Sequence, residues 1–206
     1  MNETINHKKA YLINLLKKRG INNESVLKII SEVSREYFLD EAFKHRAYDD
    51  DALPIGHNQT ISSPYIVAKM SQIIIEEDKM NKVLEIGTGC GYQTIILSHL
   101  FKKVVSIERI KSLHLRAKNI ISRFNRSNIN LLFGDGYEGS KLESPYDAII
   151  ITAAPNEIPS KLIQQLKIHG RMILPLNRDG KQILLRIKNT PRGLIEKEID
   201  DVLFVP

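Results

Sequence analysis

A series of short apolar runs from residue 82 onward constrains the fold more than any other feature of the sequence. The runs lie at residues 82–86, 104–107, 129–133, 148–151 and 172–174. Each is shorter than a typical helix and mostly apolar, as expected of strands buried on both faces of a parallel sheet. Helix-length amphipathic segments separate the first three runs. The alternation predicts an α/β fold with a doubly wound, mostly parallel sheet.

Two later apolar stretches, residues 182–187 and 201–205, are not separated by a helix-length segment. Parallel strands need a long crossover connection, whereas antiparallel strands can be joined by a short turn. These two stretches therefore predict an antiparallel edge at the C-terminal end of the sheet.

The sequence before the α/β pattern begins as helices and then loses its periodicity. Apolar side chains repeat at helical spacing between residues 11 and 16, and Gly20 follows as a helix stop. Asn22 or Asn23 can cap a second helix. Residues 35–63 show no clear period, which predicts a long irregular connection of the kind that is usually functional or disordered.

The length of 206 residues suits one substantial core. We therefore expect a single domain over residues 1–206. Its N-terminal part, residues 1–63, would supply helices and an active-site loop, and residues 64–206 would form the cofactor-binding α/β core.

A glycine-rich loop follows the first predicted strand and leads into a helix-length segment. Gly87, Gly89 and Gly91 alternate with Thr88 and a cysteine. Glycines at such a position let the backbone turn tightly and approach a ligand at the carboxyl end of the sheet, so we expect a nucleotide-like cofactor. Dinucleotide-binding loops have the pattern G-x-G-x-x-G, whereas Tyr92 occupies the last small position here. A nicotinamide oxidoreductase is therefore disfavoured, although not excluded.

Acidic residues stand at successive strand ends beside this loop. Glu108 ends the second predicted strand, roughly 20 residues after the loop, where a carboxylate can accept hydrogen bonds from the ribose hydroxyls of an adenosine. Asp135, followed by Gly136, comes directly after the third strand and could accept from the adenine amino group. Glu85, near the end of the first strand, could face a cationic part of the cofactor. Together these residues favour adenosine binding.

In these motifs and several others, the chain resembles the protein-L-isoaspartate O-methyltransferases of the bacterial type. The resemblance covers nearly the whole length, and its matching stretches include 53–56, 59–65, 83–94, 106–109, 134–136, 145–150, 153–155, 158–159, 165–166 and 204–206. The glycine loop is common to many methyltransferases of the Rossmann-like class I fold. The element Gln-Thr-Ile-Ser at residues 59–62 is much more specific.

The resemblance implies an enzyme that transfers the methyl group of S-adenosyl-L-methionine to the carboxylate of isoaspartyl residues, releasing S-adenosyl-L-homocysteine. The methyl ester would collapse to a succinimide and partly return to aspartate, which makes the reaction a repair step for damaged proteins and peptides. By the same resemblance, Ser62 lies beside the transferable methyl group. Gln59, Thr60 and Ile61 are assigned to the cofactor site.

This chemistry needs no general base, because a carboxylate with a pKa near 4 is already ionised at neutral pH. Positioning the carboxylate in line with the methyl group would supply most of the rate enhancement. Ser62 would then orient the substrate by a hydrogen bond. Alternatively, Ser62 is only a helix cap, but Ser63 is better placed for that role because it directly precedes Pro64.

Other classes of function have weaker support. Cys90 is the only cysteine, which excludes an internal disulfide and fits a cytoplasmic protein, and we interpret it as a small loop residue, not a nucleophile. No apolar run is long enough to span a membrane. The six histidines lack metal-ligand spacing, so no metal is expected.

The net charge of +6 raises the question of a nucleic-acid partner. Arg116, Lys118, Arg123 and Arg126 form the best candidate patch, but we interpret them as a solvated helix face and expect neither nucleic acid nor membrane as a partner. Two alternatives stay open: a methyltransferase with another substrate, such as a metabolite or an RNA base, and a non-catalytic module that only binds the cofactor.

Overall fold

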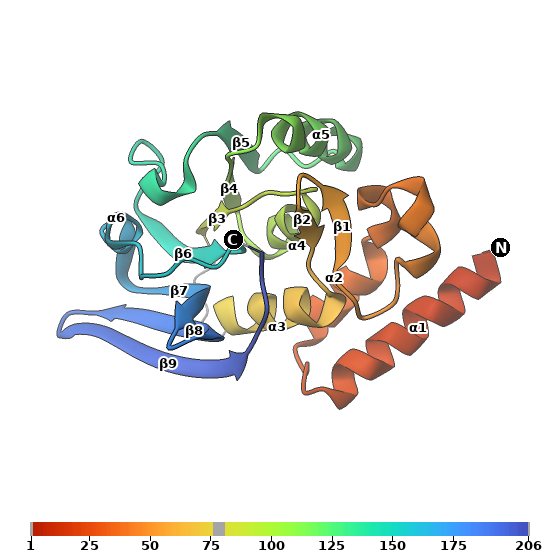
Figure 1. Cartoon of the computed structure of the whole chain (residues 1–206), viewed down its shortest axis with the longest axis horizontal. Helices are drawn as coiled ribbons and strands as arrows, with labels where there is room; N and C mark the ends of the chain where they lie inside the picture. Colours follow the sequence, from red (N-terminus) through yellow and green to blue (C-terminus); the bar gives the residue numbers. More distant parts are fainter. Residues whose placement is uncertain (1, 76–80, 206) are drawn as a thin grey trace.

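The protein is built around a seven-stranded sheet, seen in the computed structural model of Figure 1. The structure describes residues 2–75 and 81–205, so Pro206, the last residue of the family resemblance, lies outside the described residues. The strands of this sheet are β3 (Lys82–Ile86), β4 (Lys103–Glu108), β5 (Ile129–Phe133), β6 (Tyr146–Ile151), β7 (Leu166–Arg178), β8 (Lys181–Thr190) and β9 (Gly193–Asp201). Their order across the sheet is β5-β4-β3-β6-β7-β8-β9.

The first five of these strands, β3 to β7, are parallel, which confirms the predicted mostly parallel sheet. β3 pairs with β4 on one side and with β6 on the other. The chain thus winds outward from β3 to β5 and then returns to the opposite side of β3. Open α/β sheets bind ligands at such a reversal, outside the carboxyl ends of the strands.

The prediction that all these strands are buried on both faces is wrong for β5. Its side chains are partly or fully exposed, because β5 is an edge strand with β4 as its only neighbour in the sheet. The central strands agree with the prediction. In β3, for example, Val83 belongs to one hydrophobic cluster and Leu84 to another, on opposite faces of the sheet.

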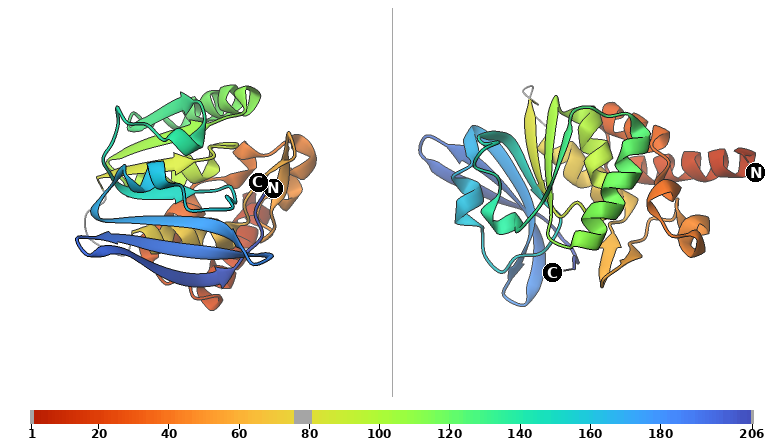
Figure 2. Two further views of the ribbon diagram at one scale, coloured as in Figure 1. Left: turned by 60° about the vertical axis from the view of Figure 1, so that its left-hand side comes forward. Right: turned by 90° about the horizontal axis from the view of Figure 1, so that it is seen from above.

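The two faces of the sheet are covered unequally (Figure 2). On one face lie α3 (Pro64–Ile74), α4 (Tyr92–Leu100) and α5 (Lys111–Ile121). On the other face lie the four-residue α6 (Ser160–Ile163) and the 3-10 helix η4 (Gly136–Glu138). The larger hydrophobic cluster accordingly lies on the side of α3, α4 and α5.

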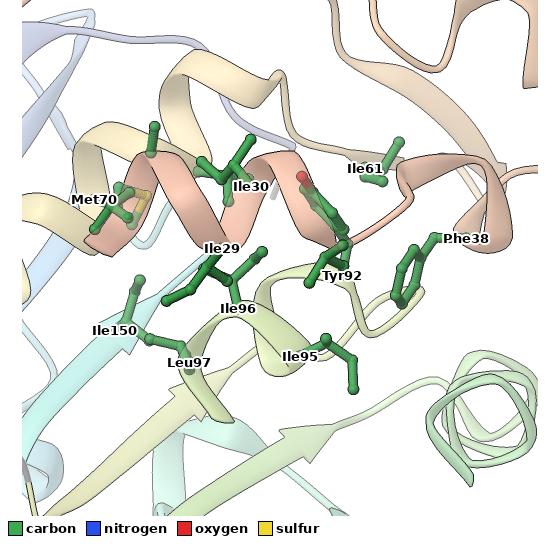
Figure 3. Packing of buried hydrophobic residues seen from close by; sticks show 14 of the residues in the cluster. Ile29, Ile30, Phe38, Ile61, Met70, Tyr92, Ile95, Ile96, Leu97 and Ile150 are labelled. Carbon is green, nitrogen blue, oxygen red and sulfur yellow. The ribbon is translucent and has the colours of Figure 1, made fainter. Parts of the chain in front are cut away.

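The N-terminal helices extend the larger cluster. α1 (Asn2–Lys18) ends before Gly20, which has the left-handed φ of 88°, and α2 (Glu24–Glu32) is capped by Asn23, whose side chain accepts from the Val26 amide at 3.1 Å. Both features were predicted. Figure 3 shows Ile29 of α2 beside Ile96 of α4. These helices are therefore part of the same core as the sheet.

Residues 35–63 are not the irregular connection that the sequence predicts. They form two 3-10 helices, η1 (Arg35–Phe38) and η2 (Glu41–Arg46), and a β-hairpin of β1 (Leu53–Gly56) and β2 (Gln59–Ile61). The hairpin turns at His57 and Asn58, both with left-handed φ near 55°. Such short elements carry too few residues to show a period, and two-residue turns with positive φ usually contain glycine.

The antiparallel C-terminal edge is confirmed, but the second of its predicted strands is misplaced. The strand is β9, at Gly193–Asp201, and residues 202–205 follow it as an extended tail. β9 is mostly exposed and carries alternating charges, so its sequence lacks an apolar run. The tail is held by Gln182 of β8, whose side chain donates to the Phe204 carbonyl at 3.1 Å and accepts from the Phe204 amide at 2.6 Å.

Candidate active site

A pocket of about 990 Å³ opens at the carboxyl ends of β3, β4, β5 and β6. The structure brings together at this pocket a subset of the residues predicted for the cofactor site. These are Gln59, Thr60, Gly87, Gly89, Glu108, Asp135 and Gly136. The other predicted residues, Ile61, Ser62, Glu85, Thr88 and Gly91, lie behind or beside this lining.

The glycine loop joins β3 to α4 and needs glycine for steric reasons. Gly87 has a φ of 93°, and a Cβ atom there would lie 2.5 Å from Oγ1 of Thr152. Gly91, with a φ of 91°, is the N-cap residue of α4, and a Cβ there would lie 2.9 Å from Ile121. Larger residues would push the loop off the sheet or off α5. The loop therefore keeps its backbone exposed to the pocket.

Glu108 fixes this loop from the end of β4. One carboxylate oxygen accepts from the Gly89 amide at 2.8 Å and the other from the Ile110 amide at 2.8 Å. The side chain is buried, yet it lines the pocket. Each carboxylate oxygen has a second lone pair, so Glu108 can still accept from two neighbouring hydroxyl groups.

Asp135 and Gly136 lie at the end of β5, where they also line the pocket. Asp135 is exposed and caps η4 by accepting from the Tyr137 amide at 3.0 Å, which leaves its other oxygen for a ligand. Gly136 is packed so closely that a Cβ atom would lie 2.3 Å from Ile86. The adjoining rings of Phe133 and Tyr137 are half-exposed and line the same end of the pocket.

Glu85 lies under the glycine loop and is fully buried. One of its oxygens accepts hydrogen bonds from Thr94 at 2.5 Å and from Ser106 at 2.6 Å. Thr88 joins this network through Ser106 at 2.6 Å. The other oxygen, Oε1, has no hydrogen-bond partner among the described residues. Burial raises the pKa of Glu85 to about 8.

The hairpin of β1 and β2 lies beside the glycine loop and forms another part of the pocket lining. Gln59 and Thr60 line the pocket, and Ile61 is buried beneath them against the larger hydrophobic cluster. Ser62 follows as a half-buried residue, and no hydrogen bond engages its hydroxyl within the part of the chain that the structure describes. The helix cap is Ser63, which accepts from the Ile66 amide at 3.4 Å. The capping role is therefore filled without Ser62.

One wall of the pocket was missing from the predicted site. It consists of residues 152–156, which follow β6, together with Pro159, Leu162 and Val205. β6 lies next to β3 at the winding reversal, and the rule that ligands bind there could have identified this segment. Val205 could not have been found in this way, because its carbonyl reaches the Ala154 amide, at 3.2 Å, only through the folded tail.

Several side chains that could suggest other functions are buried or make contacts within the fold. Cys90 is buried, and burial raises its pKa to about 11, so it is a poor nucleophile. Arg126 of the basic patch donates to Ser98 Oγ at 3.0 Å, and Arg116 pairs with Asp40 at 2.8 Å. Among residues 2–75 and 81–205 no His, Cys, Asp and Glu cluster could hold a metal ion, and no helix could cross a membrane.

Comparisons with known proteins identify the family of the chain. The family model described as protein-L-isoaspartate(D-aspartate) O-methyltransferase matches residues 6–206. Proteins named protein-L-isoaspartate O-methyltransferase are similar over most of their length. One from Pseudoalteromonas atlantica is 47% identical over 196 residues, covering 95% of this chain and 92% of its own. One from Pseudomonas paraeruginosa is 44% identical over 195 residues, with the same coverage.

Solved structures give the same result. A protein-L-isoaspartate O-methyltransferase that is 30% identical superimposes with a TM-score of 0.86, covering 96% of this chain and 65% of that one. A Plasmodium falciparum protein described under the same family name, in complex with S-adenosyl-L-homocysteine, is 26% identical. Its TM-score is 0.82, and 95% of each chain is covered.

Proposed function

The chain belongs to the protein-L-isoaspartate(D-aspartate) O-methyltransferase family, and on this premise we propose how its pocket works. The protein transfers the methyl group of S-adenosylmethionine to the carboxylate of isoaspartyl residues in damaged proteins and peptides. One observation carries the proposal: the glycine loop, Glu108, and Gln59 and Thr60 of the specific element line the same pocket.

The cofactor would lie across the carboxyl ends of β3, β4 and β5. Glu108 would accept from the ribose hydroxyls, Asp135 from the adenine amino group, and the loop from Gly87 to Gly91 would follow the methionine portion. Oε1 of Glu85, which is buried and has no hydrogen-bond partner among the described residues, would suit a cationic group of the cofactor. When bound, the cofactor supplies the electrophilic methyl group.

The protein's own contribution to the transfer would be orientation. The substrate carboxylate is already ionised, so no proton has to be removed before it attacks. The hydroxyl of Ser62, which is free of other partners among the described residues, would donate to this carboxylate and hold it in line with the methyl group. Gln59 and Thr60 would close the pocket against water.

The location of the protein and its partners are also proposals. We propose a cytoplasmic location, supported by a single reduced and buried cysteine, and protein substrates without a nucleic-acid partner. Methylation of an RNA base and non-catalytic cofactor binding are the competing functions. Both predict that isoaspartyl peptides are not methylated.

The Ser62→Ala variant tests the proposed site. If Ser62 orients a charged carboxylate, losing its hydrogen bond should cost about 1.5–3 kcal/mol in the reacting complex, or roughly tenfold or more in single-turnover rate. The affinity for S-adenosyl-L-homocysteine and the melting temperature should stay close to those of the wild type, because Ser63 caps α3.

Rate, affinity and melting temperature are to be measured on one preparation. A wild-type transfer rate in folded Ser62→Ala would reject the role of Ser62. A wild-type protein that binds the cofactor but never labels an isoaspartyl peptide would reject the proposed function itself in favour of a binding module.

A further inference from the structure

Arg35 is a buried cation in an unusual environment. Its side chain is 1% exposed, and its guanidinium donates hydrogen bonds only to backbone carbonyls among the residues that the structure describes. Nη1 donates to Ala47 at 3.0 Å and to Asp49 at 3.5 Å. Nη2 donates to Asp51 at 2.8 Å and to Ser62 at 3.0 Å. Burying a charge is costly unless it is fully hydrogen-bonded, so this arrangement requires an explanation.

The two carbonyls that share Nη2 lie at the base of the β1–β2 hairpin. Asp51 precedes β1 and Ser62 directly follows β2. A single nitrogen therefore joins the incoming and outgoing chains, next to the last residue pair of the ladder, Leu53 and Ile61. Hydrogen bonds from a charged donor are about twice as strong as neutral ones. The backbone at Ser62 is thus fixed by Arg35 and not by the hairpin alone.

Arg35 is itself fixed relative to the glycine loop. It lies in η1, whose last residue, Phe38, packs edge-on against the ring of Tyr92 with centroids 5.2 Å apart. Tyr92 is the first residue of α4 and directly follows Gly91. Figure 3 shows Phe38 beside Tyr92, and Ile61 belongs to the same hydrophobic cluster. Tyr92, Phe38 and Arg35 therefore form a chain of contacts from the glycine loop to the carbonyl of Ser62.

We propose that Arg35 is the positioning residue that sets the distance between the cofactor loop and the hydroxyl of Ser62. This inference rests on the proposed function of Ser62. The planar guanidinium can direct its N–H groups to carbonyls on two sides at once, whereas a lysine ammonium is a single point on a flexible stem. A lysine at this position would keep the charge, but its one nitrogen could not contact both the carbonyls that Nη1 reaches and those that Nη2 reaches.

The test compares Arg35→Lys with a matched control, Asn23→Ala. The control removes the cap of α2 and destabilises the fold away from the pocket. Each variant is assayed for melting temperature, S-adenosyl-L-homocysteine affinity and single-turnover transfer to an isoaspartyl peptide. Arg35→Lys should transfer about tenfold more slowly or worse, with cofactor affinity within about twofold of wild type. Asn23→Ala should lose melting temperature and keep its transfer rate.

A second comparison asks whether Arg35 acts through Ser62. In the Ser62→Ala background, Arg35→Lys should slow transfer by less than about twofold further, because the hydroxyl that it positions is already missing. Rate losses that multiply would overturn the inference, as would a wild-type rate in Arg35→Lys beside a slow Ser62→Ala. A wild-type rate in Ser62→Ala would instead reject the proposed function of Ser62 and this inference with it.

If Arg35→Lys does not fold, hydrogen exchange of the wild-type protein provides the test. With S-adenosyl-L-homocysteine bound, the paired amides of β1 and β2 should exchange about as slowly as those of α4, because the base of the hairpin is held to the core. Exchange of the hairpin at the rate of an unstructured loop would overturn the inference.

Discussion

At the scale of single residues, the site combines groups that the sequence identifies with groups that only the fold reveals. Glu108 and Asp135 could be predicted because strand ends of a parallel sheet meet at one edge. Arg35 could not, since its partners are backbone carbonyls from residues 47 to 62, and no side-chain pattern encodes them. Glu85 is intermediate: its position near the end of the first strand was predicted, but its burial with one oxygen that lacks a partner among the described residues was not.

The buried carboxyl of Glu85 predicts a pH dependence of cofactor binding. Burial raises its pKa to about 8, whereas the unfolded chain has a value of about 4.3. Between these values the folded protein binds more protons than the unfolded chain, so Glu85 lowers stability as the pH rises. A cationic group bound beside Glu85 would lower its pKa again. Binding would then release a proton.

The affinity for S-adenosyl-L-homocysteine should therefore increase between about pH 5 and pH 7, by up to about tenfold per pH unit. The Glu85→Gln variant, which cannot titrate, should show a flatter profile. Calorimetric titrations at several pH values check this. Equal slopes in the two proteins would mean that Glu85 does not interact with the cofactor's charge.

At the scale of elements, the strands of the central sheet are predictable from sequence and the elements that close the pocket are not. β3 and β5 have the predicted bounds, because each coincides with a short, mostly apolar run of the sequence. β1 and β2 are only four and three residues long, and their order depends on Arg35. β9 is stabilised by pairing with β8 along an exposed edge, which places no apolar requirement on its sequence.

The tail after β9 predicts an effect of Gln182 on the pocket. Gln182→Ala removes two hydrogen bonds to the Phe204 backbone and should cost about 1–3 kcal/mol of stability. Because Val205 lines the pocket, kcat/KM for an isoaspartyl peptide should fall several-fold.

Denaturant unfolding and steady-state kinetics check the effect of Gln182→Ala. The matched control is Thr190→Ala, which removes a hydrogen bond to the Gly193 carbonyl at the other end of β8 and should leave kcat/KM unchanged. Equal kinetics in Gln182→Ala and the wild type would show that the tail is not a functional part of the pocket.

At the scale of the whole molecule, the N-terminal segment and the α/β core depend on each other. Leu16 of α1, Val26 of α2 and Ile61 of β2 belong to the same hydrophobic cluster as Val83 of β3 and Ile95 of α4. This continuity supports the proposal that residues 1–206 fold as one domain. In the pocket, the core contributes Gly87, Gly89 and Glu108, and the N-terminal segment contributes Gln59 and Thr60.

The most direct test of the account is methyl transfer to two synthetic peptides that differ only in one linkage, isoaspartyl or aspartyl. The enzyme and S-adenosylmethionine are incubated with each peptide, and mass spectrometry follows the methyl ester and the succinimide that forms as methanol leaves. We predict that the isoaspartyl peptide is esterified and converted to succinimide, while the aspartyl peptide is unchanged. Equal esterification of both peptides, or of neither, would contradict the assignment of this pocket to isoaspartyl repair.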